Sequence, residues 1–165
     1  MIILLALLLS GPQSGFFRWH SDTSVQVYFA PGFSTEQQAA ALRGMQAWNV
    51  GGITFTRVGE TIDIQKCKNC LTLQRGTSSS KKELAHLGVW HLVEYEWIEY
   101  AWIILDERTR SVEAIESFVT HETGHSLGLL DCDCKSVMGR FTGGLNKPGP
   151  LLTSGDRKAA MGNYR

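Results

Sequence analysis

Two histidines and a glutamate at helical spacing are the residues of this chain best suited to chemistry. His121 and His125 are four positions apart, so on a helix both imidazoles project from one face, one turn apart. Two imidazoles placed in this way can bind one metal ion, and Glu122, beside the first of them, can act as a general base. The H-E-x-x-H spacing therefore predicts zinc chemistry on a helix. The alternative is a surface helix that merely carries two histidines.

The residues after the second histidine supply a candidate third ligand. Gly128 follows His125 by three positions, where a glycine in the left-handed conformation can end a helix. The chain can then fold back and bring Asp131 to the same metal ion. Three protein ligands with one open position are typical of a catalytic zinc site rather than a structural one. Asp131 could instead orient a ligand histidine, which would leave the third ligand elsewhere.

Residues 121–131 resemble the metzincin signature H-E-x-x-H-x-x-G-x-x-H, with Asp131 in place of the third histidine, as in snapalysin-type proteases. Ser136-Val137-Met138-Gly139 resembles the Met-turn of that family, whose methionine lies beneath the metal site. Looser similarity to the matrixin branch extends over most of residues 16–165. On a plain surface helix, the offsets of Glu122 and Met138 from the two histidines would be coincidences.

The resemblance implies a fold and a mechanism. The fold is an α+β metzincin/matrixin-like catalytic domain with a mixed, mostly parallel sheet, an antiparallel edge strand, two long helices and a C-terminal helix. The function is that of a secreted zinc endopeptidase, with one zinc ion bound by His121, His125 and Asp131. Glu122 takes a proton from the attacking water and delivers it to the leaving amine. Because Asp131 is anionic, the water at the zinc would be less acidic than in a site of three histidines.

A second hypothesis is a non-catalytic zinc-binding domain that binds polypeptides on the same scaffold. Glu122 argues against it, because a binding module has no use for a general base beside the metal. A further structural metal ion, such as a second zinc bound by His86 or His91, or Ca²⁺, is conceivable but has no support from spacing. The same holds for His20, so we expect these histidines to be ordinary side chains.

The surrounding periodicity predicts the elements that position these residues. Residues 24–29 alternate as a strand, and Ser34 or Thr35 begins a helix that ends near Trp48. Ser111 is expected to cap the helix that carries the two histidines, and a last helix is expected over about 155–163. Further strands are predicted at residues 53–58, 61–64, 71–73, 84–92 and 101–105, with 94–100 unassigned.

Two segments are expected to contact a substrate if the resemblance holds. An edge strand at residues 85–90 would bind an extended polypeptide through main-chain hydrogen bonds. The loop at residues 140–150 would wall the pocket for the residue after the scissile bond, as the corresponding loop does in the family.

Composition limits the remaining possibilities. The chain has 165 residues, of which 43% are hydrophobic, and it carries no net charge. This is ordinary globular composition without the basic excess that is typical of nucleic-acid binding or of a polybasic membrane anchor. We expect a monomer. The apolar run at residues 2–9 predicts a signal peptide over 1–15, a single domain over 16–165 and secretion, the alternative being a buried apolar segment.

The four cysteines form two close pairs in the sequence, Cys67 with Cys70 and Cys132 with Cys134. In an exported protein an even number of cysteines favours disulfides, and three pairings are possible. Closure between Cys67 and Cys70 is feasible, whereas a ring between Cys132 and Cys134 would be tight. One zinc ion bound by all four thiolates is the remaining alternative.

Overall fold

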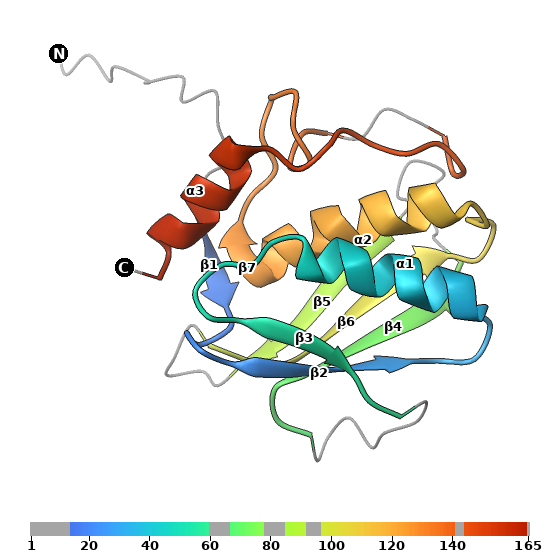
Figure 1. Ribbon diagram of the computed structural model, residues 1–165, viewed down its shortest axis with the longest axis horizontal. Coiled ribbons are helices and arrows are strands. Elements are labelled where there is room, and N and C mark those ends of the chain that lie inside the picture. The colour runs from blue at the N-terminus through green and yellow to red at the C-terminus, as the bar shows by residue number, and fades with distance from the viewer. Residues whose placement is uncertain (1–13, 60–66, 78–84, 92–96, 141–143, 165) are drawn as a thin grey trace, which may run out of the picture.

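A five-stranded sheet carries two helices across one face, and a third helix lies beside one end of the layer (Figure 1). The computed structural model describes residues 14–59, 67–77, 85–91, 97–140 and 144–164. The elements are β1 (Ser14–Arg18), β2 (Ser24–Phe29), α1 (Thr35–Gln46), β3 (Thr54–Arg57), β4 (Cys70–Gly76), β5 (Ala85–His91), β6 (Ile98–Asp106), α2 (Val112–Ser126), β7 (Leu127–Leu129) and α3 (Ser154–Gly162).

The main sheet has the strand order β3-β2-β4-β6-β5. Its β2–β3, β2–β4 and β4–β6 pairs are parallel, whereas β5 pairs antiparallel with β6 and lies at the edge. The predicted mixed sheet with an antiparallel edge strand is therefore confirmed, and β5 covers the segment 85–90 expected at that edge. The strand predicted at residues 61–64 lies outside the described residues.

The helices begin where the sequence places hydroxyl caps. The Ser34 side chain accepts a hydrogen bond from the Gln37 amide at 3.3 Å, and Ser111 accepts one from the Ala114 amide at 3.2 Å. Helix α1 ends at Gln46, slightly before the predicted Trp48. The Trp48 indole nitrogen instead donates to the Thr120 carbonyl at 2.8 Å and thereby ties the end of α1 to α2.

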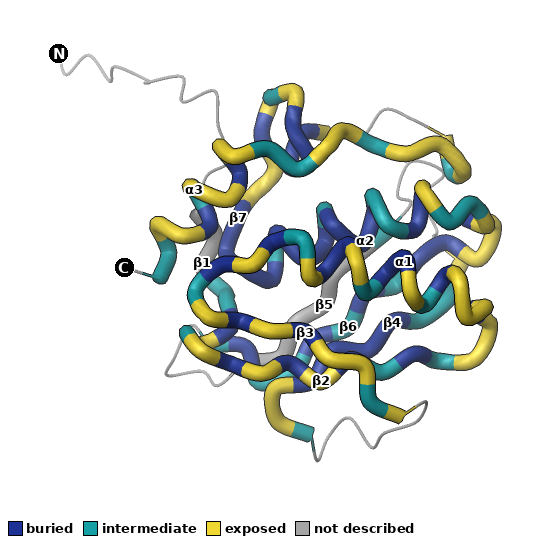
Figure 2. The backbone as a smooth tube through the Cα atoms, viewed as in Figure 1, coloured by how far each residue is buried: buried dark blue, intermediate teal, exposed yellow. Residues whose placement is uncertain are grey.

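The hydrophobic core lies between the main sheet and the paired helices α1 and α2 (Figure 2). Alternate residues of β2 point into it, as the period of two in its sequence predicts. Helix α2 contributes Ile115 and Val119 from its sheet-facing side, and both are fully buried. The core therefore fixes α2 firmly against the sheet.

Among the described residues, no helix is long and apolar enough to cross a bilayer.

A second, two-stranded sheet joins β1 antiparallel to β7, directly after α2. Neither strand was predicted from the sequence. β7 has only three residues, too few for a recognisable alternation. The first two residues of β1 fall within the expected signal peptide. The cysteines pair locally, Cys67 with Cys70 and Cys132 with Cys134, so the two pairs do not share a zinc site.

Candidate metal centre

The last turns of α2 and the chain that follows it bring three potential metal ligands together. The Nε2 atoms of His121 and His125 lie 3.1 Å apart. The Oδ1 atom of Asp131 lies 3.3 Å from Nε2 of His121 and 3.5 Å from Nε2 of His125. Within the described ranges, these side chains form the one group of histidine, cysteine or acidic residues able to hold a metal ion.

Main-chain carbonyls hold both imidazoles in the same tautomer. Nδ1 of His121 lies 2.7 Å from the Val137 carbonyl oxygen, and Nδ1 of His125 lies 2.8 Å from that of Leu129. A carbonyl oxygen can only accept, so each Nδ1 must carry the proton. Each Nε2 then presents its lone pair toward Asp131, which is the arrangement that a metal-binding histidine requires.

This donor set fits a tetrahedral divalent cation such as zinc. Ligand atoms about 2.0–2.2 Å from a tetrahedral zinc ion stand roughly 3.3–3.5 Å from one another. The spacings of 3.1, 3.3 and 3.5 Å are close to that value. Two lone pairs and a carboxylate facing one another would repel without a cation between them. Geometry and charge therefore favour the same kind of ligand.

The electrostatic environment of the site attracts positive charge. Burial disfavours the charged form of His121, but the Asp131 carboxylate, the charge of Glu122 and the Val137 carbonyl outweigh it and raise its pKa. When His121 is protonated on both ring nitrogens, its Nε2–H can donate to Asp131, and this hydrogen bond lowers the pKa of Asp131, although partial burial opposes the shift. Both shifts indicate that the pair stabilises a cation, whether a proton or a metal ion.

Glu122 is positioned by α2 beside the two histidines. Its residue is only 6% exposed, although a carboxylate is costly to bury. Its charge contributes, after the hydrogen bond with Asp131, to raising the pKa of His121. The helix thus holds one carboxylate close to the ligand group, in addition to the Asp131 carboxylate that converges on the two histidines.

The segment predicted to resemble a Met-turn lies directly against α2. The Gly139 amide donates to the Ser136 carbonyl at 2.9 Å and closes the turn. Met138 is fully buried, and a methyl group added at Gly124 would overlap its sulfur. Close approach of this turn to α2 is what allows the Val137 carbonyl to reach His121.

A helix remote in sequence fixes the same turn. The Ser136 hydroxyl donates to Oδ1 of the fully buried Asp156 at 2.7 Å. The other carboxylate oxygen of Asp156 accepts from the amide and the hydroxyl of Thr153, which caps α3. This helix was predicted from the sequence, but Asp156 had no predicted role. The Thr153-x-x-Asp156 spacing was the available signal for a cap, though not for the contact with Ser136.

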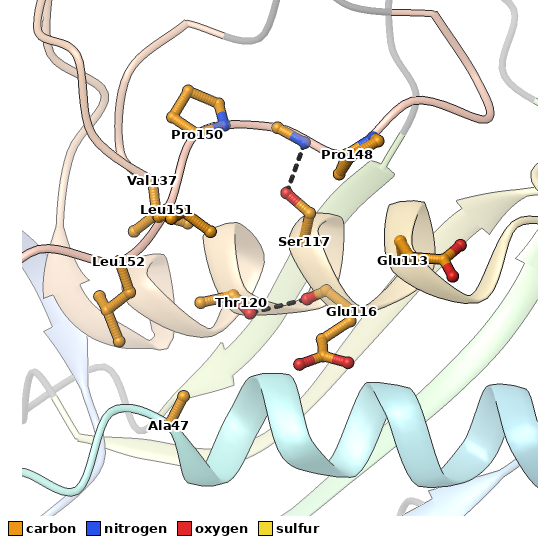
Figure 3. Close-up of a pocket in the computed structure, with 11 residues that line it drawn as sticks. Ala47, Glu113, Glu116, Ser117, Thr120, Val137, Pro148, Pro150, Leu151 and Leu152 are labelled. Carbon is orange, nitrogen blue, oxygen red and sulfur yellow. Dashed lines mark hydrogen bonds between the residues drawn. The ribbon is translucent and has the colours of Figure 1, made fainter.

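A pocket of about 440 Å³ lies over the face of α2 turned away from the sheet (Figure 3). Ser117 and Thr120 of α2 line one side, and the segment 148–152 passes over them. The Gly149 amide donates to the Ser117 hydroxyl at 2.7 Å and anchors this segment. Val137 also lines the pocket, so the pocket and the candidate metal centre share the turn at 136–139.

The other histidines are not brought to the centre by any described contact. His20 contacts the Ser21 carbonyl at 3.0 Å, and its ring lies 4.9 Å from that of Trp97. His86 and His91 belong to the edge strand β5, but their side chains lie outside the described part of the structure. A second metal site at these histidines therefore has no observation in its favour.

Comparison with solved structures identifies the fold. The chain is similar to metalloproteinase-II from Bacteroides fragilis, with a TM-score of 0.56 and 14% identity over 94% of this chain and 58% of that protein. It is also similar to two structures of myroilysin. The first has a TM-score of 0.58 and 13% identity over 93% of this chain and 98% of that one. The second has a TM-score of 0.53 and 15% identity over 89% and 85%.

These likenesses are of fold, since the identities are low, and they agree with the metzincin-like α+β domain expected from the sequence. The chain spans less than two thirds of the length of the Bacteroides protein. No protein-family model and no curated protein sequence matches the chain. The protein therefore has the fold of these metalloproteinases.

Proposed function

We propose that this protein is a zinc endopeptidase, with His121, His125 and Asp131 as the zinc ligands and Glu122 as the general base. The observation that carries the proposal is the convergence of three ligand atoms within 3.5 Å, with both imidazoles oriented through Nδ1. A structural zinc site is normally closed by four protein ligands. A group of three protein ligands suits a centre that leaves a position for chemistry.

The protein's own residues have separate roles in this scheme. Zinc bound by these ligands supplies a Lewis acid for peptide hydrolysis. Glu122 accepts a proton from the water that attacks the scissile carbonyl carbon, and later donates it to the leaving nitrogen as the C–N bond breaks. The carbonyls of Val137 and Leu129 hold the two imidazoles in place throughout.

An extended polypeptide is the proposed substrate. In the described sheet, β5 pairs only with β6, so its outer edge has main-chain groups that can add a further strand. The pocket over α2 has an apolar wall that includes Val137, Pro150 and Leu151. We assign it to an apolar substrate side chain, and its link to the metal centre through the turn at 136–139 supports this assignment.

Secretion is part of the same proposal. The apolar run at residues 2–9 is the sequence feature that supports it, and disulfides at both cysteine pairs suit an oxidising compartment. We propose residues 16–165 as the mature domain and a monomer as its form.

The decisive experiment compares the purified protein with the Glu122→Gln variant, measuring bound zinc and hydrolysis of casein. We expect about one zinc ion per chain in both proteins and hydrolysis in the unsubstituted protein alone, because glutamine cannot take the proton. An active variant would remove Glu122 from the mechanism. Zinc in both proteins without hydrolysis in either would favour the non-catalytic binding domain.

A further inference from the structure

Helix α3 contacts both flanks of the candidate metal centre, one with each of its ends. Its N-terminal end holds the turn at 136–139 through Asp156 and Ser136. Its C-terminal end holds β7 through Asn163, the residue that caps the helix. In Figure 1, α3 lies beside the β1–β7 pair at the end of α2.

The Asn163 contact is made by one side-chain amide and two consecutive carbonyls. Nδ2 of Asn163 donates to the Leu127 oxygen at 3.0 Å and to the Gly128 oxygen at 3.2 Å. The next carbonyl in the chain, that of Leu129, accepts from Nδ1 of His125. Asn163 thus fixes the two peptide groups immediately before the one that orients a proposed zinc ligand.

Gly128 is the residue that allows this approach. Its φ of +83° is disfavoured for residues with a side chain, and a Cβ there would lie 3.0 Å from Nδ2 of Asn163. The strand β1 pairs with the same segment, Arg18 opposite Leu127. The short β7 is therefore held by a strand through its main chain and by Asn163 through its carbonyls.

The other end of α3 repeats the arrangement for His121. Asp156 binds Ser136, and the carbonyl of the following residue, Val137, accepts from Nδ1 of His121. Each end of the helix therefore binds a residue that lies one or two positions before the carbonyl that orients one histidine.

We propose that α3 stabilises the metal centre from both of its ends and that Asn163 is a positioning residue for His125. The contacts that carry this proposal are those of the Asn163 side chain with the carbonyls of β7. The inference rests on the proposed zinc site for its effect on affinity, but its effect on the orientation of His125 does not require a metal ion.

The test uses Asn163→Asp, which keeps the shape of the side chain but replaces the donor with an oxygen facing two carbonyls. The first measurement is the ¹⁵N NMR signal of the imidazoles in metal-free protein at about pH 8, where free histidine is neutral. We expect the Nδ1 proton of His125 to exchange with water several-fold faster and that of His121 to be unchanged. Ser136→Ala should give the opposite result, with His121 affected.

The second measurement is zinc affinity by competition with a chelator, together with the visible spectrum of the cobalt-substituted protein. Loss of groups that orient metal-bound histidines typically lowers affinity about 10–100-fold. Because Asn163 binds the peptide groups next to the carbonyl that orients His125, and not His125 itself, we expect zinc affinity to fall about tenfold and the cobalt spectrum to change. Asn163→Ser, a smaller change, provides the same comparison if the aspartate variant does not fold.

Met161→Gly is the matched control, since Met161 is 43% exposed and lies on α3. It should lower the melting temperature through reduced helix propensity and leave the zinc affinity and the His125 signal unchanged. An unchanged His125 signal in Asn163→Asp would overturn the proposal that Asn163 positions His125. An equal loss of zinc affinity in Met161→Gly and Asn163→Asp would also overturn it, because any destabilisation of α3 would then be enough to weaken zinc binding. Failure of the zinc proposal is separate, since it appears as absence of zinc from the unsubstituted protein.

Discussion

The carboxylate of Asp131 lies 3.3 Å from Nε2 of His121, across the loop that leaves α2. This residue is more exposed than either histidine, with 54% of its side chain accessible. An exposed aspartate gains little from burial or packing, so its position beside both imidazoles is best explained by a shared cation.

Replacing Asp131 with alanine should therefore weaken zinc binding more than about 100-fold, which exceeds the usual effect of an indirect partner. Asp131→Asn, which retains an oxygen but lacks the charge, should give an intermediate loss. Competition with a chelator measures both affinities. A loss of less than about tenfold in the alanine variant would mean that Asp131 orients a histidine rather than binding the metal ion.

Replacing Gly124 with alanine should destabilise the protein although alanine favours helices. The added methyl would lie 2.7 Å from the Trp48 ring and would overlap the sulfur of Met138. Overpacking of this kind typically costs about 1–3 kcal/mol, which exceeds the helix-propensity gain of about 1 kcal/mol. Urea unfolding of metal-free protein measures the change in the free energy of unfolding.

Gly162→Ala is the control for this substitution, since no atom outside the adjacent helix backbone and chain neighbours lies within 4 Å of the methyl it would add at the end of α3. We expect no loss, and a gain of up to about 1 kcal/mol. If both alanine variants were equally stable, close packing between α2 and the turn at 136–139 would not be the reason for Gly124.

Replacing Leu151 with aspartate should alter substrate preference. Leu151 lines the pocket yet is 84% exposed, so the substitution should leave the free energy of unfolding almost unchanged. A charge at the pocket should lower kcat/KM about tenfold for peptides with a large apolar residue after the cleaved bond, because losing a few buried methylenes is worth about 1–3 kcal/mol. Zinc affinity should be unaffected. Met161→Asp, on an exposed part of α3, should change neither kcat/KM for these peptides nor zinc affinity.

Replacing Asp106 with asparagine should destabilise the protein in a pH-dependent manner. Asp106 is 3% exposed and lies at the end of β6. The side-chain hydrogen bond from Arg108 is the main reason that its pKa lies below the ordinary 3.8. A lowered pKa in the folded state means that the ionised form contributes stability above the unfolded-state value, and that this contribution is lost as pH falls through the folded-state value.

The difference in free energy of unfolding between the two proteins should therefore be constant above about pH 5 and should shrink below about pH 4. We expect it to be only about 1 kcal/mol, because solvent screens an ion pair with an exposed partner such as Arg108. Urea unfolding at several pH values gives this difference directly. A difference that grows in acid would contradict the assigned sign.

The sequence predicted those parts of the fold that have a local signature. The hydroxyl cap at Ser111, the helical spacing of His121 and His125, and the alternation along β2 all depend on neighbouring residues and were correct. The edge strand β5 was placed correctly, and its antiparallel direction came from the family resemblance. The metal-binding role of Asp131 stays a prediction, although the structure brings its carboxylate to the two histidines.

The remaining features depend on contacts between distant residues. The carbonyls of Val137 and Leu129 are main-chain groups, which every residue type supplies, so no side chain marks them. Asn163 resembles any polar residue at the end of a helix, and its role appears only once α3 lies against β7. These parts of the site could not be predicted from one sequence.

The contacts of α3 with the metal centre also affect when the site can form during synthesis of the chain. A nascent chain made only as far as residue 150 already contains the three proposed ligands and the proposed general base, but it lacks both Asp156 and Asn163. Because folding during synthesis proceeds from the N-terminal side, the sheet and α2 can form before the contacts of α3 exist. Alignment of the two histidines would then wait until residues 156–163 have been made, which would delay proteolytic activity beyond the synthesis of the ligands themselves.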